Sequence, residues 1–216
     1  MGTLRYETTI SLDGFTTGPD PGLEHPLGVG GERLHQWIFG LASWRESHGE
    51  SGGETGPDDE LLKESVEANG AIIMGRRMFS GGSGPWGDDP NADAWWGDEP
   101  PFGVPVFVLT HHERESEAKK GGTTFNFVTD GIEAALEQAK EAAGDRDVGI
   151  AGGASVARQY LKAGLLDEML LHVAPVLMGD GVRLFEDPVS DGQVELECTQ
   201  VVSSPVVTHL RYRVAS

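Results

Sequence analysis

The stretch "IAGGASVARQYLKAGLLDEMLLHVAPVLMGDGVRLF", from Ile150 to Phe185, decides the fold class. A strand is predicted to end in it at residue 151, a helix follows over 154–164, and an apolar strand lies within 165–177. Two strands that flank one helix favour a parallel pair joined by a crossover. Gly152 and Gly153 stand at the junction between the first strand and the helix.

The rest of the chain extends this alternation of strands and helices. Further strands are predicted at 4–12, 71–75, 104–110, 123–129 and 147–151. Helices are predicted at 31–44, at 58–70 with Gly70 as its stop, and at 130–144 with Asp130 as N-cap and Gly144 as stop. The segments 193–204 and 206–214 predict a closing hairpin. We therefore expect a single α/β domain over 1–216, with a mixed, mainly parallel sheet, helices on both faces and a C-terminal antiparallel hairpin.

Composition narrows the class of protein. The 216 residues carry a formal net charge of −19, which opposes a nucleic-acid partner because such a partner requires a basic face. No apolar run reaches the roughly 20 residues that span a bilayer, and the N-terminus has no signal-peptide pattern. The single cysteine, Cys198, has no partner for an internal disulfide. We expect an acidic cytoplasmic protein with no membrane partner.

Two predicted strand ends carry side chains suited to anions. In "IIMGRRMF" (72–79) a buried strand ends at Gly75 and is followed by Arg76 and Arg77, whose guanidinium groups suit phosphate oxygens. The alternative is a surface pair that balances nearby carboxylates. In "FVLTHHERE" (107–115) a strand delivers Thr110, His111, His112 and Arg114 to a loop, where they could contact a phosphate or a purine, or form a polar turn. Adjacent histidines lack the spacing of a metal pair, so no metal is expected.

The third strand end is the Gly152-Gly153 junction. Backbone amides at a helix start favour an anion, and glycine lets a ligand approach the backbone closely. Alternatively, the glycines supply only the freedom of a tight turn. Ligands of parallel sheets bind at the carboxyl ends of strands, so three anion-friendly ends at one edge are a stronger signal than any one of them.

Four segments taken in order resemble the dihydrofolate-reductase-like superfamily. They are "TTISLDGF", "AIIMGRRMF", "VPVFVLT" and the stretch from Gly149 to Phe185. The sequence is more similar to the branch of the reductase domain of bacterial riboflavin biosynthesis, the RibD C-terminal-like branch, than to dihydrofolate reductase itself. The resemblance covers nearly the whole chain, with gaps at 16–57 and 80–103, and implies a three-layer dihydrofolate-reductase-like fold.

The resemblance implies NADPH bound along the carboxyl edge of the sheet, with a peptide at Gly152–Gly153 that is often cis. The implied cofactor contacts are Gly75, Arg76, Arg77, Thr110, His111, Gly152, Gly153, Ala154, Ser155 and Val156. Asp13 is the candidate acid or substrate anchor, or an ordinary turn aspartate beside Gly14, which would close over the substrate. Trp37 would line the substrate pocket or pack in the core. A homodimer is also implied.

The implied reaction is hydride transfer from NADPH to a C=N or C=O group of a small heterocycle, of the 5-amino-6-(5-phosphoribosylamino)uracil type. A dihydrofolate or pterin reductase is an alternative, although the Pro-Trp turn and the acidic helix residue of those enzymes are not found cleanly. The residues equally allow a catalytically silent nucleotide-binding module or a binding protein that takes no nucleotide. The loop 81–103 presents Trp86, Trp95 and Trp96, either as a lid or as a dimer contact.

Overall fold

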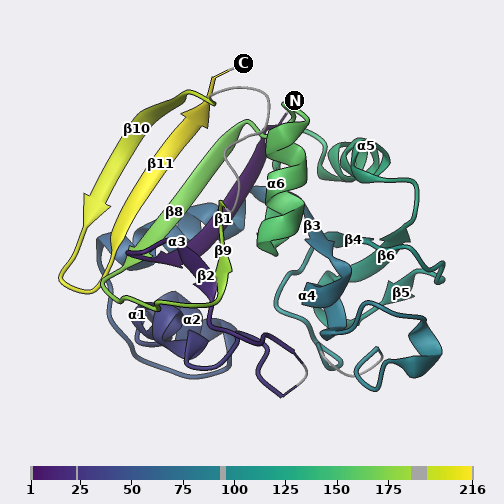
Figure 1. Cartoon of the computed structure of the whole chain (residues 1–216), viewed down its shortest axis with the longest axis horizontal. Helices are drawn as coiled ribbons and strands as arrows, with labels where there is room; N and C mark the ends of the chain where they lie inside the picture. The colour runs from purple at the N-terminus through teal and green to yellow at the C-terminus, as the bar shows by residue number, and fades with distance from the viewer. Residues whose placement is uncertain (1, 23, 93–95, 186–193, 216) are drawn as a thin grey trace.

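The computed structural model describes residues 2–22, 24–92, 96–185 and 194–215 (Figure 1). Its strands are β1 (Leu4–Ser11), β2 (Phe15–Thr17), β3 (Asn69–Gly75), β4 (Pro105–Leu109), β5 (Glu117–Ala118), β6 (Thr124–Val128), β7 (Asp147–Gly152), β8 (Glu168–Ala174), β9 (Val182–Arg183), β10 (Leu196–Ser203) and β11 (Thr208–Val214). Its α-helices are α1 (Gln36–Phe39), α2 (Ala42–Ser47), α3 (Pro57–Ala68), α4 (Arg76–Ser80), α5 (Ile132–Ala143) and α6 (Ala154–Lys162). Short 3-10 turns are η1 (Gly31–His35), η2 (Trp86–Asp88) and η3 (Lys120–Gly122).

One large sheet runs through the described residues in the order β10-β11-β8-β1-β7-β3-β4-β6-β5. The inner strands from β8 to β6 are all parallel, whereas β11, β10 and β5 are antiparallel to their neighbours. The mixed, mainly parallel sheet and the C-terminal hairpin are thus confirmed. The consequence for function is that the carboxyl ends of β1, β7, β3, β4 and β6 lie along one edge.

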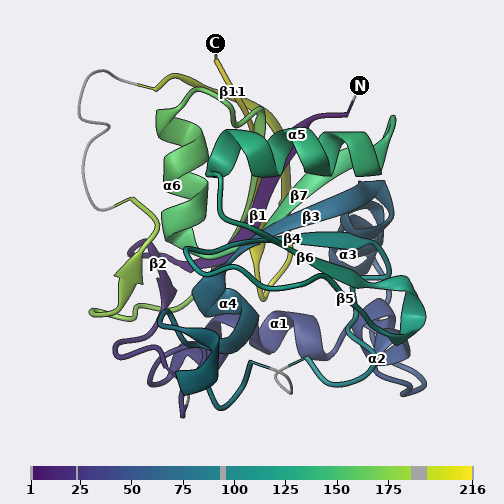
Figure 2. The ribbon, with the colours of Figure 1, turned by 90° about the vertical axis from the view of Figure 1, so that its right-hand side faces the viewer.

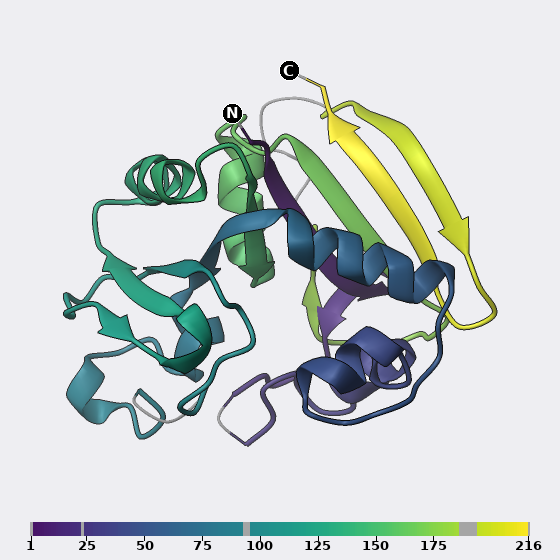
Figure 3. The ribbon, with the colours of Figure 1, turned by 180° about the vertical axis from the view of Figure 1, so that it is seen from behind.

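Helices cover both faces of this sheet. Helices α5 and α6 lie on one face (Figure 2), where the largest core cluster includes Tyr6, Ile73, Ile150 and Tyr160. Helix α3 crosses the other face, with α1 and α2 beside it (Figure 3). The side chains explain this layering because β1 alternates: Leu4 and Tyr6 enter the large core, whereas Arg5 between them faces α3.

The helix predicted at 31–44 is broken in the structure. It consists of η1, α1 and α2, and the interruption falls at Gly40 and Leu41. Leu41 has an extended backbone, with φ −72° and ψ 146°, and forms an isolated bridge with Glu54. Burial of the Leu41 side chain in the cluster around Trp37 offsets the loss of helical continuity there.

Two predicted helix boundaries were also wrong. Gly70 lies inside β3 rather than at a helix end. A Cβ at this position would stand 2.8 Å from backbone atoms of Ala143 at the end of α5, which explains why the residue is glycine. The glycine therefore serves the packing of helix on sheet. Asp130 does not cap α5: Gly131 occupies the N-cap position and no side chain bonds there. The predicted stop at Gly144 is confirmed, with φ 64°.

Trp86 and Trp96 of the segment 81–103 pack inward rather than forming a free lid. Trp86 and Trp96 lie against the cluster formed by Ile72, Val106 and Phe125 on the face of β3, β4 and β6 opposite α5. The Trp86 ring meets Phe127 edge-on at 5.0 Å. Trp95 lies outside the described residues. The described part of this segment is therefore a cover for one end of the sheet.

Candidate functional site

Two glycines at the carboxyl edge are explained by packing within the protein. Gly75 ends β3 and Gly152 ends the neighbouring β7. A Cβ on Gly75 would lie 2.9 Å from Cγ2 of Val156, and one on Gly152 would lie 2.6 Å from Sδ of Met78. Gly152 also has φ 146°, a conformation that favours glycine. The expectation that a cofactor requires glycine at both positions of the pair is therefore corrected at Gly152, where the neighbouring atom is a sulfur of the protein.

Gly153 differs from Gly152 because nothing in the protein fills the space beside it. Its φ is −90°, which any residue adopts, and no heavy atom lies within 4 Å of a Cβ built there. The Gly152–Gly153 peptide is cis, as the resemblance implies. Gly153 is also exposed. The space beside this strand end is thus open, and a small ligand group could approach the backbone there.

Helix α6 begins directly beside this open space. Gly153 is its N-cap and no side chain caps it, so the first amides of the helix have no intrahelical partner. Ala154 and Val156 bury their side chains in the core, and the Val156 N–H donates to the Gly153 carbonyl at 3.0 Å. The candidate amides for a ligand are therefore those of Ala154 and Ser155, and Ser155 is exposed. The positive end of the helix and these amides together favour a phosphate at Gly153.

Arg76 is committed to a carboxylate and not to an open anion site. Its side chain is 7% exposed, its Nη2 lies 2.5 Å from Oδ2 of Asp89, and its Nη1 donates to Ser80. Although burial opposes the shift, hydrogen bonds from Ser80 and Arg76 lower the pKa of the Asp89 carboxyl. The guanidinium also lies 3.7 Å from the ring centre of Trp86. This corrects the expectation of a paired phosphate grip, because of the two arginines only Arg77 is exposed.

Thr110 and His111 also differ in exposure: Thr110 is buried and His111 is exposed. The Thr110 hydroxyl is buried and accepts the backbone N–H of His112 at 3.1 Å, so it closes the turn after β4. The carbonyl of His112 accepts the Trp86 indole N–H at 2.9 Å, which ties this turn to the segment 81–103. His111 is exposed at the same turn. Of the two predicted contacts, His111 is thus the side chain placed to meet a ligand.

A surface pocket of about 420 Å³ lies where the chain after β4 runs beside the end of β6. It is lined by Glu113, Arg114, Glu115, Phe127 and Thr129. Arg114 donates from Nη1 to the Ala92 carbonyl and from Nη2 to Glu117, each at 3.1 Å. A ligand near this loop was predicted from the sequence, but the two glutamates were missed. The alternation in "HHERE" was the available signal, because alternate residues share a side of an extended chain.

The Asp13 carboxylate binds backbone amides. Its Oδ1 accepts from the Met178 N–H at 3.0 Å and its Oδ2 from the Gly179 N–H at 2.8 Å. Hydrogen bonds from the Ser11 hydroxyl and the Met178 amide lower the pKa of Asp13 to about 2. An ionised carboxylate held by two amides fits an anchor, and the role of Asp13 as acid or substrate anchor stays a prediction. It joins the turn after β1 to the loop after β8, and Gly14, with φ 87°, allows that turn.

Trp37 packs in the core and does not line an open site. It is 7% exposed, its ring centre lies 4.8 Å from that of His172 and 5.2 Å from that of His209, and its indole N–H donates to Thr9 Oγ1 at 3.3 Å. Of the two expectations for Trp37, core packing matches the structure. The helical spacing indicated a buried face, but spacing alone did not tell a pocket wall from a core.

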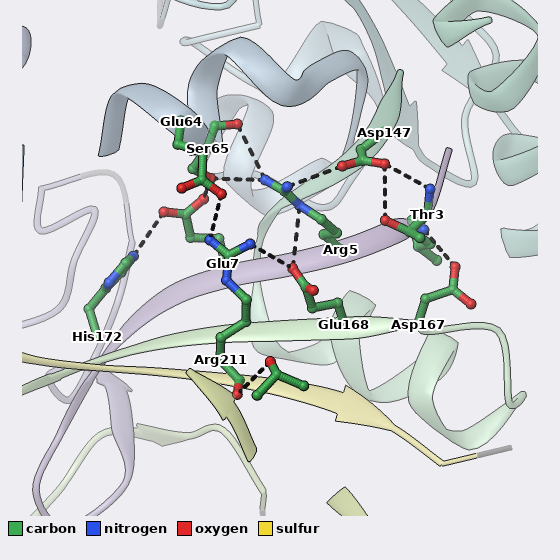
Figure 4. A network of polar contacts seen from close by, with 12 residues as sticks. Thr3, Arg5, Glu7, Glu64, Ser65, Asp147, Asp167, Glu168, His172 and Arg211 are labelled. Carbon is green, nitrogen blue, oxygen red and sulfur yellow. Dashed lines mark hydrogen bonds and ion pairs between the residues drawn. The ribbon is translucent and has the colours of Figure 1, made fainter. Parts of the chain in front are cut away.

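The face of the sheet under α3 holds a network of charged side chains (Figure 4). Arg5 of β1 lies 3.1 Å from Asp147 of β7 and also bonds Ser65 of α3. Arg211 of β11 pairs with Glu168 at 3.5 Å and with Glu64 of α3 at 3.1 Å. The network therefore ties four strands to one helix, and its charges explain why α3 packs on a face that carries few apolar side chains.

Beside this network four titratable groups form a chain: Glu7, His172, His209 and Asp58. His172 Nε2 lies 2.9 Å from Glu7, the two Nδ1 atoms are 2.6 Å apart, and His209 Nε2 lies 3.1 Å from Asp58. In the contact between the two Nδ1 atoms one nitrogen donates and the other accepts, and each Nε2 faces a carboxylate. In the described residues no cluster of three or more such groups fits a metal ion.

We predict that acid destabilises the fold through this chain. Burial and the neighbouring His172 lower the pKa of His209, although Asp58 opposes the shift. In the unfolded chain His209 binds a proton near pH 6.5, whereas in the folded chain its lowered pKa keeps it neutral at that pH. The contribution of His209 to the free energy of unfolding is therefore full above about pH 6.5 and is lost as pH falls. Urea unfolding at a series of pH values from 7.5 to 5 measures the slope, which His209→Gln should flatten and exposed His111→Gln should not. An unchanged slope in the His209 variant would contradict the prediction.

Comparison with known proteins now identifies the family. Residues 3–210 match the model of the RibD C-terminal domain. The chain belongs to the RibD C-terminal domain family. YyaP of Bacillus subtilis is 30% identical over 139 residues, which are 63% of this chain and 70% of YyaP. YwjB of the same organism is 29% identical over 83 residues, 38% of this chain, and the match spans about half of YwjB (47%).

Two solved structures share the fold. A putative riboflavin biosynthesis protein of Shewanella sp. PV-4 has a TM-score of 0.64 at 18% identity, with 99% of each chain covered. Dihydrofolate reductase of Enterococcus faecalis, in complex with NADP(H), has a TM-score of 0.52 at 13% identity. The match covers 100% of this chain and 98% of the reductase chain. The dihydrofolate-reductase-like fold of the RibD C-terminal domain is thus confirmed.

Proposed function

We propose that this RibD C-terminal domain is a reductase that binds a reduced nicotinamide dinucleotide along the carboxyl edge of its sheet. The observation that carries the proposal is the open space at Gly153, beside the uncapped start of α6. A site of this form suits a pyrophosphate, because backbone amides and the helix end meet it where no side chain intervenes. Membership of a reductase-like family supports the same conclusion.

The residues fit this cofactor in distinct ways. The amides of Ala154 and Ser155, and the Ser155 hydroxyl, would hold the pyrophosphate at the start of α6. When bound, the cofactor supplies a hydride to an electrophilic carbon of the substrate. The turn at Asp13 and Gly14 ends β1, the strand next to β7, and its bonds to the loop after β8 hold that side of the site in place.

The acceptor that we propose is a C=N or C=O group in a small heterocycle, of the 5-amino-6-(5-phosphoribosylamino)uracil type or a pterin. The family match and the likeness to a putative riboflavin biosynthesis protein support the first class. Because the Asp13 carboxyl has a pKa of about 2, we assign no proton transfer to it. A homodimer stays a prediction that rests on the resemblance alone.

The test is a titration followed by a turnover assay. Purified protein is titrated with NADH and with NADPH, and oxidation of the reduced nicotinamide is then followed with pterin and aminouracil acceptors. We expect micromolar binding and oxidation that depends on one acceptor class. Binding with no oxidation across both classes would favour a silent nucleotide-binding module, and absence of binding would contradict the proposed function.

A further inference from the structure

We propose that the pocket lined by Glu113, Arg114, Glu115, Phe127 and Thr129 receives the adenosine end of the cofactor and selects a free ribose 2′-hydroxyl, so that the protein prefers NADH to NADPH. The inference rests on the proposed function, because it assumes a dinucleotide on this edge. It reverses the NADPH preference implied by the resemblance.

The position of the pocket suits one half of a dinucleotide. Along the carboxyl edge, β7 is followed by β3, β4 and β6, and Gly153 follows β7 while the pocket lies at the end of β6. Three strand spacings of about 4.8 Å separate the two places, a length on the order of one nucleoside. The volume of about 420 Å³ is in the range of small-molecule sites. A pyrophosphate at Gly153 would thus leave the adenosine to extend toward this pocket.

The charges of the pocket decide which ribose fits. Glu113 and Glu115 contribute two carboxylates, and a carboxylate accepts hydrogen bonds from a ribose hydroxyl. A 2′-phosphate would instead bring further negative charge against both carboxylates, which are exposed, so the repulsion acts through solvent and weakens as salt is added. The net charge of −19 adds to the repulsion.

Three cations near this edge already have carboxylate partners. Arg114 in the lining is 3.1 Å from Glu117, which also receives Lys119 at 2.6 Å. Arg76 is 2.5 Å from Asp89. Arg77 is exposed and is the second residue of α4, which follows β3, two strands away from β6. A phosphate in the pocket would therefore compete with existing ion pairs for its cation.

The experiment compares two cofactors that differ only in the 2′-phosphate. The whole chain is titrated with NADH and with NADPH at one fixed ionic strength, and binding is followed by quenching of tryptophan fluorescence. We expect NADH to bind about tenfold more tightly, a difference of roughly 1.4 kcal/mol. The double variant Glu113→Gln with Glu115→Gln should narrow that ratio several-fold. Exposed Glu137→Gln on α5, a matched loss of carboxylate charge, should leave the ratio unchanged.

The outcomes separate this inference from the proposed function. Tighter NADPH binding, or a cofactor ratio that the Glu113 and Glu115 changes do not alter, overturns the NADH preference while the reductase proposal stands. Failure of both cofactors to bind overturns both. A narrowed ratio in the double variant together with an unchanged ratio in the Glu137 control supports the inference, because an effect of overall charge would appear in both.

Discussion

Gly153→Ala is expected to fold as the parent does and to bind nicotinamide dinucleotides at least about tenfold more weakly. The backbone at Gly153 suits any residue, and no atom lies within 4 Å of the added methyl group. We therefore expect a change in stability within about 1 kcal/mol, the cost of a poorer N-cap. The methyl group would occupy the space that we assign to the cofactor.

The neighbouring change Gly152→Ala provides the contrast. Its methyl group would lie 2.6 Å from Met78 Sδ at a φ of 146°, so we expect a loss of stability of about 1–3 kcal/mol. Chemical denaturation and cofactor titration of both variants measure the two effects separately. If Gly153→Ala bound cofactor as the parent does, the open space at the start of α6 would not be the pyrophosphate site.

Trp37→Ala is expected to give the largest loss of stability, about 3–5 kcal/mol. The ring packs between His172, His209 and the neighbouring apolar residues, and its N–H bonds Thr9. Trp37→Phe keeps most of the ring contact and should cost about 1 kcal/mol through the lost hydrogen bond. Urea denaturation measures both changes. Unaltered stability of Trp37→Ala combined with weaker binding of an acceptor would restore Trp37 to the substrate pocket.

The sheet could be predicted because local patterns specify it. Apolar segments and their alternation with helices located all the inner strands, and the alternating ends of the chain gave the hairpin β10–β11. The helix predicted at 31–44 failed at Gly40 and Leu41, where a contact distant in sequence, between Leu41 and Glu54, competes with helical spacing. Gly70 was misassigned for a similar reason, since its role depends on Ala143 of α5.

The candidate site could be located from sequence but not resolved residue by residue. Strand ends of a parallel sheet share an edge, which brought Gly75, Thr110 and Gly153 to one region. The partners of individual side chains could not be predicted from the sequence. Asp89, which forms an ion pair with Arg76, lies in a segment without periodicity. The backbone amides that donate hydrogen bonds to the Asp13 carboxylate come from a loop about 165 residues later in the chain. Such pairs depend on tertiary packing and leave no local pattern.

Hydrogen–deuterium exchange with and without saturating reduced nicotinamide dinucleotide tests the central claim most directly. If the cofactor lies on the carboxyl edge with its pyrophosphate at the start of α6, the amides of Gly153, Ala154 and Ser155 should become strongly protected, and peptides covering the 110–115 turn should follow. Peptides from α3, on the opposite face of the sheet from α6, should not change. Protection confined to other segments, or none at a concentration that saturates binding, would contradict the account.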